Sequence, residues 1–195
     1  MPTQRMPQSR EASQTIIDAL TADEVENNEG DPDIVVQDHG LTLADMKGLA
    51  YDDPQWQDFL EQISVDEMSN LVSNGGWCTP AVPSVDKPQF TEIDGPNGLN
   101  NIMAGTTGNQ YTGQSVLGCT WNQQLATEMG KTFAQEAKAM RVSGLYAPGV
   151  NIHRNPFGGR NYEYFSEDGV HSGLMAAAEI QGIQSEGVYC YTKHF

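Results

Sequence analysis

The sequence predicts an α/β fold built from βαβ units, and three observations lead to that prediction. After Gly75, short apolar runs typical of strands alternate with amphipathic helical patterns. Polar residues follow the strand-like runs, as they do at the carboxyl edge of a parallel sheet. Residues 1–70 differ in composition from the rest, with 16 acidic and 3 basic residues against 10 and 7. Together these features favour right-handed βαβ connections in a parallel α/β barrel or an open parallel sheet, preceded by an acidic segment.

Residues 1–40 are polar and acidic, and their short apolar clusters lie at positions 16–17 and 34–36. Such a segment buries too little apolar surface to offset the entropy that ordering costs. We interpret residues 1–40 as an acidic linker or a partly disordered lead-in, with an acidic binding tail as the alternative. Residues 41–195 are then the folded domain, which is long enough for a sizeable core.

Two amphipathic helices are expected at the start of this domain, over residues 54–60 and 64–72. The second opens with Ser64 and has Glu67 three residues later, which is the pattern of a capping box. We therefore expect the side chains of Ser64 and Glu67 to satisfy the free backbone N–H groups of the first turn.

The later elements follow from apolar runs and from residues that begin or end helices. Strands are expected over residues 90–93, 115–118, 145–147 and 188–192. One helix is expected to begin at a Thr120 cap, with Gln123 in the capping-box position, and to end near Gly144. A second helix is expected over residues 170–185, ending at Gly187.

The net charge of −16 makes some functions improbable. It disfavours contact with nucleic acid and with anionic membrane surfaces, because like charges repel before contact forms. The sequence has no apolar run of about 18 residues, and its first ten residues lack the apolar stretch of a secretory signal. We expect a cytoplasmic protein with neither nucleic-acid nor membrane partners, and nothing in the sequence indicates an oligomeric state.

No metal site or cofactor is expected. Cys78, Cys119 and Cys190 are odd in number and form no CxxC pair, so we interpret them as small buried residues in a reducing compartment. Gly130-Lys131-Thr132 lacks the earlier glycine of a phosphate-binding loop, since Leu125 stands there.

The remaining histidines and two of the tryptophans can be placed from their sequence context. His39, His153 and His171 show no metal-ligand spacing and are expected at the surface or in loops. Trp121, at a helix start, is expected in the core. Trp77 precedes the first strand of the domain; it is either a core residue or a platform on which a sugar ring stacks.

Three short segments combine the polar groups with tight turns. DGPNGL places Asp94 directly after a strand, and NPFGGRNYEYFSED places Arg160 after paired glycines, near acidic residues that could hold it. TKHF places Lys193 and His194 at the end of the last strand, where they serve one site if the chain turns there. We therefore expect a pocket lined by these four side chains at the carboxyl edge of the sheet.

With these segments in this order, residues 43–195 resemble the barrel domain of glycoside hydrolase family 3, the β-glucosidase and β-xylosidase group. The resemblance implies a (β/α)8 barrel and a β-glucoside or oligosaccharide substrate. It also implies that Asp94, Arg160, Lys193 and His194 bind sugar hydroxyls at the cleavage subsite. Charged groups suit this task, because sugar hydroxyls both donate and accept hydrogen bonds.

The sequence departs from the family pattern in ways that bear on activity. The family often has a basic residue at the position of Asn100 and a proline at that of Gly169. Its nucleophile is the Asp of a Ser-Asp-Trp segment, which is absent here. A complete barrel needs about 250 residues, so we expect an incomplete barrel that is inactive by itself. A non-catalytic carbohydrate-binding or scaffold protein is the alternative.

Overall fold

The computed structural model describes residues 11–22, 34–100 and 105–194 and divides the chain into two units, Met1–Ile34 and Val35–Phe195. In the first unit, helix α1 (Gln14–Thr21) has no buried residue. This helix was not predicted from the sequence. The site described below lies entirely in the second unit.

The second unit begins with the two expected helices, α2 (Gln55–Glu61) and α3 (Val65–Ser73). The predicted capping box of α3 is confirmed: the Glu67 N–H donates to Ser64 Oγ, and the Ser64 N–H donates to Glu67 Oε2 at 2.9 Å. These helices enclose a small apolar core with the turn around the 3-10 helix η1 (Pro83–Val85). The buried residues of this core are Met46, Phe59, Ile63, Val82 and Val85.

The sheet has four described strands in the order β1-β2-β3-β4. They are β1 (Cys78–Thr79), β2 (Phe90–Asp94), β3 (Gly144–Tyr146) and β4 (Tyr189–Cys190). Strands β2, β3 and β4 are parallel, as predicted, but β1 was not predicted and pairs antiparallel with β2. The sheet is therefore mixed.

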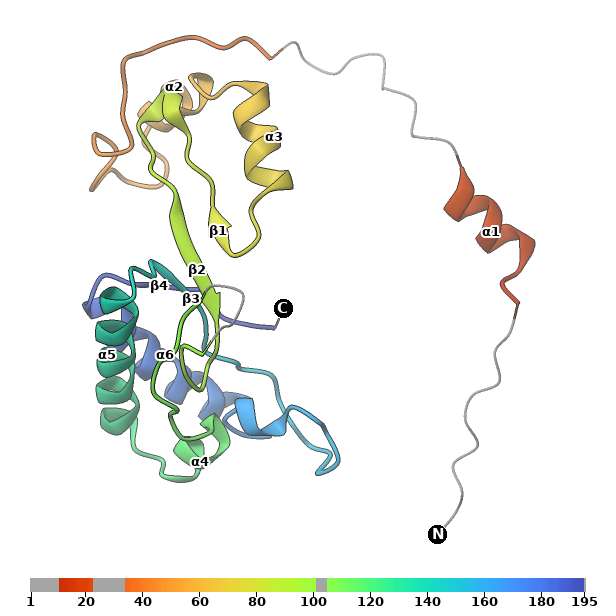
Figure 1. Cartoon of the computed structure of the whole chain (residues 1–195), viewed down its shortest axis with the longest axis vertical. Coiled ribbons are helices and arrows are strands. Elements are labelled where there is room, and N and C mark those ends of the chain that lie inside the picture. The colour runs from red at the N-terminus through yellow and green to blue at the C-terminus, as the bar shows by residue number, and fades with distance from the viewer. Residues whose placement is uncertain (1–10, 23–33, 101–104, 195) are drawn as a thin grey trace. The chain divides into compact units, whose positions relative to one another are not determined.

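Helices α5 (Gln123–Ala139) and α6 (Gly169–Ser185) lie together on one side of these strands (Figure 1). Ile93 of β2 and Leu145 of β3 pack against Phe133 of α5 in the main core. The two helices approach closely at Gly130 and Gly182. A Cβ atom at Gly130 would lie 2.3 Å from the Glu179 carbonyl oxygen, so the Gly130-Lys131-Thr132 run serves helix packing.

The predicted strand over residues 115–118 is wrong, because this segment belongs to helix α4 (Gln114–Cys119). A short apolar run is compatible with either a strand or a buried helical turn. Tertiary contacts decide for the helix: Leu117 joins a core cluster with Phe165, and a Cβ atom at Gly118 would lie 2.4 Å from the Phe165 carbonyl oxygen.

Both predicted ends of α5 are also wrong. Asn122, not Thr120, caps α5 by accepting a hydrogen bond from the Leu125 N–H, while Thr120 ends α4. After α5 the left-handed residue is Arg141, with φ of 59°, and not Gly144, which lies in β3. The prediction for the end of α6 is confirmed, since Gly187 has φ of 81°.

The structure contradicts the predictions for Trp121 and His171, whose side chains contact each other. Trp121 is 73% exposed and lies outside the core. His171 lies in α6, is buried, and contacts the Gly118 carbonyl oxygen at 2.8 Å. Their rings stack with centroids 3.9 Å apart, so the tryptophan covers the histidine from the solvent side. The cysteines depart from expectation too, because Cys119 is exposed and the other two are half-buried.

Among the described residues, no helix has the length and apolar character needed to span a membrane.

Candidate functional site

The site begins at Asp94, the last residue of β2, where the chain turns sharply. Gly95 follows with φ of 137°, and a Cβ atom on it would lie 2.1 Å from the Gly98 carbonyl oxygen. Only glycine fits both restrictions. The Gly95 N–H donates to Asp94 Oδ1 at 2.8 Å, so the turn itself orients the carboxylate.

Lys193 links Asp94 to a second carboxylate. Its ammonium forms an ion pair with Asp94 Oδ1 and lies 3.7 Å from Glu163 Oε2. The Glu163 side chain is 4% exposed and that of Lys193 is 14% exposed. Because a buried charge is costly without a partner, these two groups stabilise each other in the folded protein.

Glu163 also holds Arg160, three residues earlier in the loop. Arg160 Nε and Nη2 donate to the two oxygens of this carboxylate, the second at 3.2 Å. A bidentate contact of this kind fixes the plane of the guanidinium. Glu163, the last residue of the 3-10 helix η2 (Asn161–Glu163), thus contacts both Arg160 and Lys193, the two cations predicted for the site.

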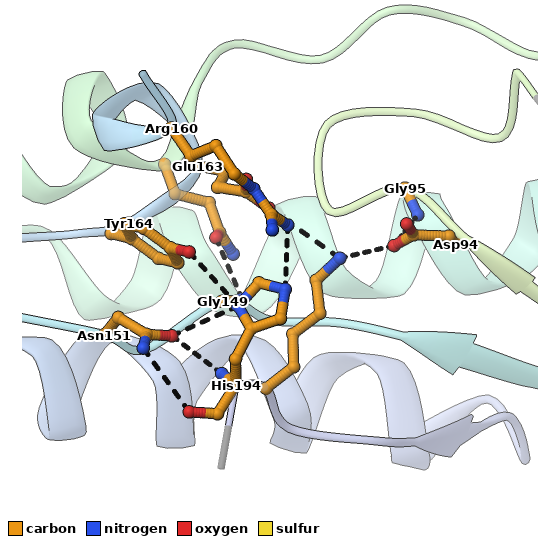
Figure 2. Close-up of polar contacts among 10 residues, drawn as sticks. Asp94, Gly95, Gly149, Asn151, Arg160, Glu163, Tyr164 and His194 are labelled. Carbon is orange, nitrogen blue, oxygen red and sulfur yellow. Dashed lines mark hydrogen bonds and ion pairs between the residues drawn. The ribbon is translucent and has the colours of Figure 1, made fainter. Parts of the chain in front are cut away.

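His194 completes the network (Figure 2). Its Nε2 lies 2.8 Å from Arg160 Nη2, and its Nδ1 lies 3.1 Å from the Tyr164 hydroxyl and 3.2 Å from Asn151 Oδ1. A guanidinium can only donate, so we assign Nε2 as the acceptor and Nδ1 as the protonated nitrogen of a neutral ring. Burial lowers the pKa of His194, and the positive charges of Arg160 and Lys193 lower it further, which agrees with the neutral form.

Asn151 fixes the backbone at His194. Its side chain accepts a hydrogen bond from the His194 N–H at 2.7 Å and donates to the His194 carbonyl oxygen at 3.3 Å. Nearby, Gly149 forms isolated parallel bridges with Lys193 and with Tyr164. The segments after β3 and β4 therefore run side by side into the site, and the Lys193–His194 peptide bond is cis.

Two cavities adjoin this network. One of about 270 Å3 is lined by Asp94, Arg160, Glu163 and Lys193, together with Asn100, the residue that departs from the family pattern. Another, of about 340 Å3, is lined by aromatic and charged groups: Trp77, Asp94, Tyr146, Tyr191, Thr192, Lys193 and His194. The Trp77 ring packs on Tyr146 with centroids 5.7 Å apart and is 43% exposed. Of the two interpretations of Trp77, the exposed ring beside the charged groups favours the stacking platform.

The structure brings all four predicted site residues together, whereas only one of the three acids expected near Arg160 contacts it. Glu163 does so. Asp168 instead caps α6 by accepting from the N–H groups of Val170 and His171. Glu167 lines a separate cavity of about 630 Å3. Sequence distance could not separate the three acids, since all of them follow Arg160 within eight residues of the same loop.

Neither Tyr164 nor Asn151 was predicted as a site residue. Their roles depend on contacts with His194 across 30 and 43 residues of chain. No local pattern predicts such pairs. The departure at Gly169 has a simple structural setting: it is the first residue of α6, the position at which proline is well tolerated.

One cluster of side chains of the types that can bind a metal ion lies elsewhere in the described chain. His39, Asp58 and Glu61 each present a ligand atom, and these atoms lie within 4.8 Å of one another. His39 Nε2 is 3.0 Å from Glu61 Oε2, so a hydrogen bond between these two side chains accounts for their closeness. In the network around Asp94, Asp94 Oδ1 and both oxygens of Glu163 contact the Lys193 ammonium or the Arg160 guanidinium.

Comparison with known proteins gives a consistent family. Residues 81–195 match the model of the glycosyl hydrolase family 3 N-terminal domain. A putative β-glucosidase of Schizosaccharomyces pombe is 38% identical over 142 residues, which are 71% of this chain and 17% of that protein. A β-glucosidase of Ruminococcus albus is 34% identical over 173 residues, which are 81% of this chain and 18% of that protein.

A solved structure agrees with the sequence matches. β-Glucosidase 3B of Thermotoga neapolitana, determined in complex with α-D-glucose, superposes with a TM-score of 0.62 at 36% identity. The superposition covers 72% of this chain and 23% of that one. The chain therefore spans about a fifth of the length of these relatives.

Proposed function

The chain belongs to glycosyl hydrolase family 3, and from that premise we propose that it carries the sugar-binding part of a β-glucosidase-like active site. The observation that supports this most directly is the single network of Asp94, Glu163, Lys193, Arg160 and His194 beside two cavities. We propose Asp94, Arg160, Lys193 and His194 as ligands of the sugar hydroxyls. Trp77 is an apolar surface against which the sugar ring packs.

This set of groups suits a neutral polyol. The Asp94 carboxylate accepts from hydroxyl groups, Arg160 and Lys193 donate to them, and neutral His194 offers a weaker contact. As positive charge develops on the ring in the transition state, the sugar hydroxyls become better donors, so their hydrogen bonds to the Asp94 carboxylate strengthen. The network thus favours an oxocarbenium-like geometry over the ground state, which is how a binding subsite contributes to rate.

The two carboxylates of this network serve binding and not proton transfer. Retaining hydrolysis needs a nucleophile and a general acid that holds a proton. Asp94 and Glu163 both accept from cations, which leaves neither as a proton donor. We propose that the nucleophile and the acid/base belong to a longer parent enzyme, and that the 195-residue chain hydrolyses nothing alone.

The length of the relatives supports an incomplete barrel over residues 41–195 in this proposal, with residues 1–40 as an acidic lead-in. Aromatic residues on the sheet face opposite α5 and α6 support it further. Tyr189 and Tyr191 are 49% and 40% exposed. In a closed barrel, further strands would cover that face.

The proposal is tested in the full-length parent with an aryl β-glucoside. Asp94→Ala or Arg160→Ala should lower kcat/KM by roughly 30- to 5,000-fold, because losing a charge-assisted bond costs about 2 to 5 kcal/mol. Glu167→Ala, in the same loop but without a contact to the network, is the matched control. Unchanged kcat/KM in both site variants would refute the assigned roles. Turnover by the purified chain above a mock preparation would refute its inactivity.

A further inference from the structure

A buried carboxylate lies beneath the site and takes no part in the sugar network. Glu92 is 4% exposed and accepts hydrogen bonds from three hydroxyl groups on three other segments. Tyr191 donates to Oε1 at 2.7 Å, Tyr146 donates to Oε2 at 3.0 Å, and Thr79 also donates to Oε1. A buried carboxylate with this many donors is held in one position.

The position of Glu92 relative to the site follows from strand alternation. Glu92 and Asp94 are two residues apart in β2, so their side chains lie on the same face. Tyr191 and Lys193 are likewise two residues apart in the segment that follows β4. The hydrogen bond from Tyr191 to Glu92 therefore lies on the same face as the ion pair between Lys193 and Asp94, and two residues earlier along both segments.

The hydrogen bond between Tyr191 and Glu92 is well placed to control the ion pair between Lys193 and Asp94. Beyond Cys190 the regular strand ends. The Tyr191 N–H still donates to the Leu145 carbonyl oxygen at 2.8 Å. Lys193 is held on both sides: its N–H donates to the Pro148 carbonyl oxygen at 3.1 Å, and its carbonyl oxygen accepts from the Val150 N–H at 2.7 Å. These bonds attach the segment to β3 and to the residues after β3, but none of them reaches β2, the strand that carries Asp94. The Tyr191 phenol reaches across to β2 and ties the segment to the strand that carries Asp94.

We propose that Glu92 is a positioning residue that, through the Tyr191 hydroxyl, sets where the Lys193 ammonium meets Asp94. The role of that ion pair in sugar binding rests on the function proposed above, but the geometry of the ion pair does not. Burial, with the nearby Glu92 charge, raises the pKa of Tyr191, so the phenol remains a donor throughout the working pH range.

The first experiment uses the 195-residue chain without ligand. NMR of the Lys193 ε-methylene group, assigned with Lys193→Met, is compared in wild type, Tyr191→Phe, Glu92→Ala and Glu92→Gln. We expect the signal to move toward that of an exposed lysine in Tyr191→Phe and Glu92→Ala. Glu92→Gln, which keeps one acceptor oxygen, should show a smaller change.

Thr79→Val is the matched control. It removes another hydroxyl from the same oxygen of Glu92, but from β1, which carries none of the four predicted site residues. Its Lys193 signal should stay near the wild-type position, as should the signal of Lys131 in every variant. An unchanged Lys193 signal in Tyr191→Phe would overturn the proposal. So would an equal displacement in Thr79→Val, because the effect would then be general.

The second experiment measures glucose affinity of the full-length parent for wild type, Tyr191→Phe, Lys193→Met and the double variant. If Tyr191 acts through Lys193, Tyr191→Phe weakens binding roughly tenfold alone, and not at all when Lys193 is already absent. Equal effects in both backgrounds would overturn the positioning role. If the wild-type protein binds no glucose, the proposed sugar site fails, while the ligand-free NMR result still decides the role of Glu92.

Discussion

Glu179 offers the sharpest test of the energetics of this fold. It lies in α6 with no exposed surface, and the Gln114 amide donates to its Oε2 at 3.2 Å. Among the described residues, Glu179 Oε1 has no hydrogen-bond partner. Burial raises the pKa of Glu179 from 4.5 to about 7, and the bond from Gln114 opposes that rise only in part.

The sign of the resulting pH dependence follows from linkage. The folded protein binds the Glu179 proton more tightly than the unfolded chain does, so stability from this group is fully present below about pH 4.5. It is lost as the pH rises through about 7. A difference of this size corresponds to about 3 kcal/mol in the free energy of unfolding, at 1.36 kcal/mol per pKa unit.

Replacing Glu179 by glutamine removes the ionisation and keeps the shape. The carbonyl oxygen of the introduced amide can still accept from Gln114, although the new NH2 group takes the place of the unpartnered oxygen and costs about 1 kcal/mol. We therefore expect E179Q to be close to wild type or slightly less stable at pH 4.5, and more stable by about 2 kcal/mol at pH 8.

Urea unfolding followed by tryptophan fluorescence between pH 4.5 and 8.5 measures this difference. E128Q, at an exposed position of α5, is the matched control and should show no such gain at high pH. A stability difference between E179Q and wild type that is independent of pH would refute the reasoning. It would mean that Glu179 either ionises normally or is already neutralised in another way.

Two further predictions concern the site itself. In Arg160→Ala, the pKa of His194 should rise toward its ordinary value, because one of the two adjacent positive charges is removed; NMR titration of the imidazole measures it, and an unchanged pKa would contradict the assigned contact. Gly95→Ala should distort the turn after Asp94, since the added methyl group would meet the Gly98 carbonyl oxygen, and it should weaken glucose binding by the parent at least tenfold. Gly159→Ala, where no atom lies within 4 Å of the added carbon, is its control, and equal affinities in the two variants would show that the turn does not orient Asp94.

Local signals in the sequence were sufficient to predict several structural features. The capping box at Ser64 and Glu67 and the glycine that ends α6 involve groups within a few residues of one another, so a short window contains all the partners. Helices α5 and α6 and the parallel strands β2, β3 and β4 followed from apolar periodicity. Where a run was short, as at residues 115–118, periodicity could not separate a strand from a helical turn, and packing against Phe165 decided it.

By itself, the sequence determined the family and predicted the residue types of the candidate site, because three short segments carry them in a distinctive order. Only the tertiary structure decided which groups meet. Asp94 and Lys193 form an ion pair across 99 residues, Glu163 rather than its acidic neighbours holds Arg160, and Glu92 lies under the site bound to Tyr191. The physical reason is that such contacts depend on strand register and on burial, which bring distant segments together and leave no pattern within a local stretch of sequence.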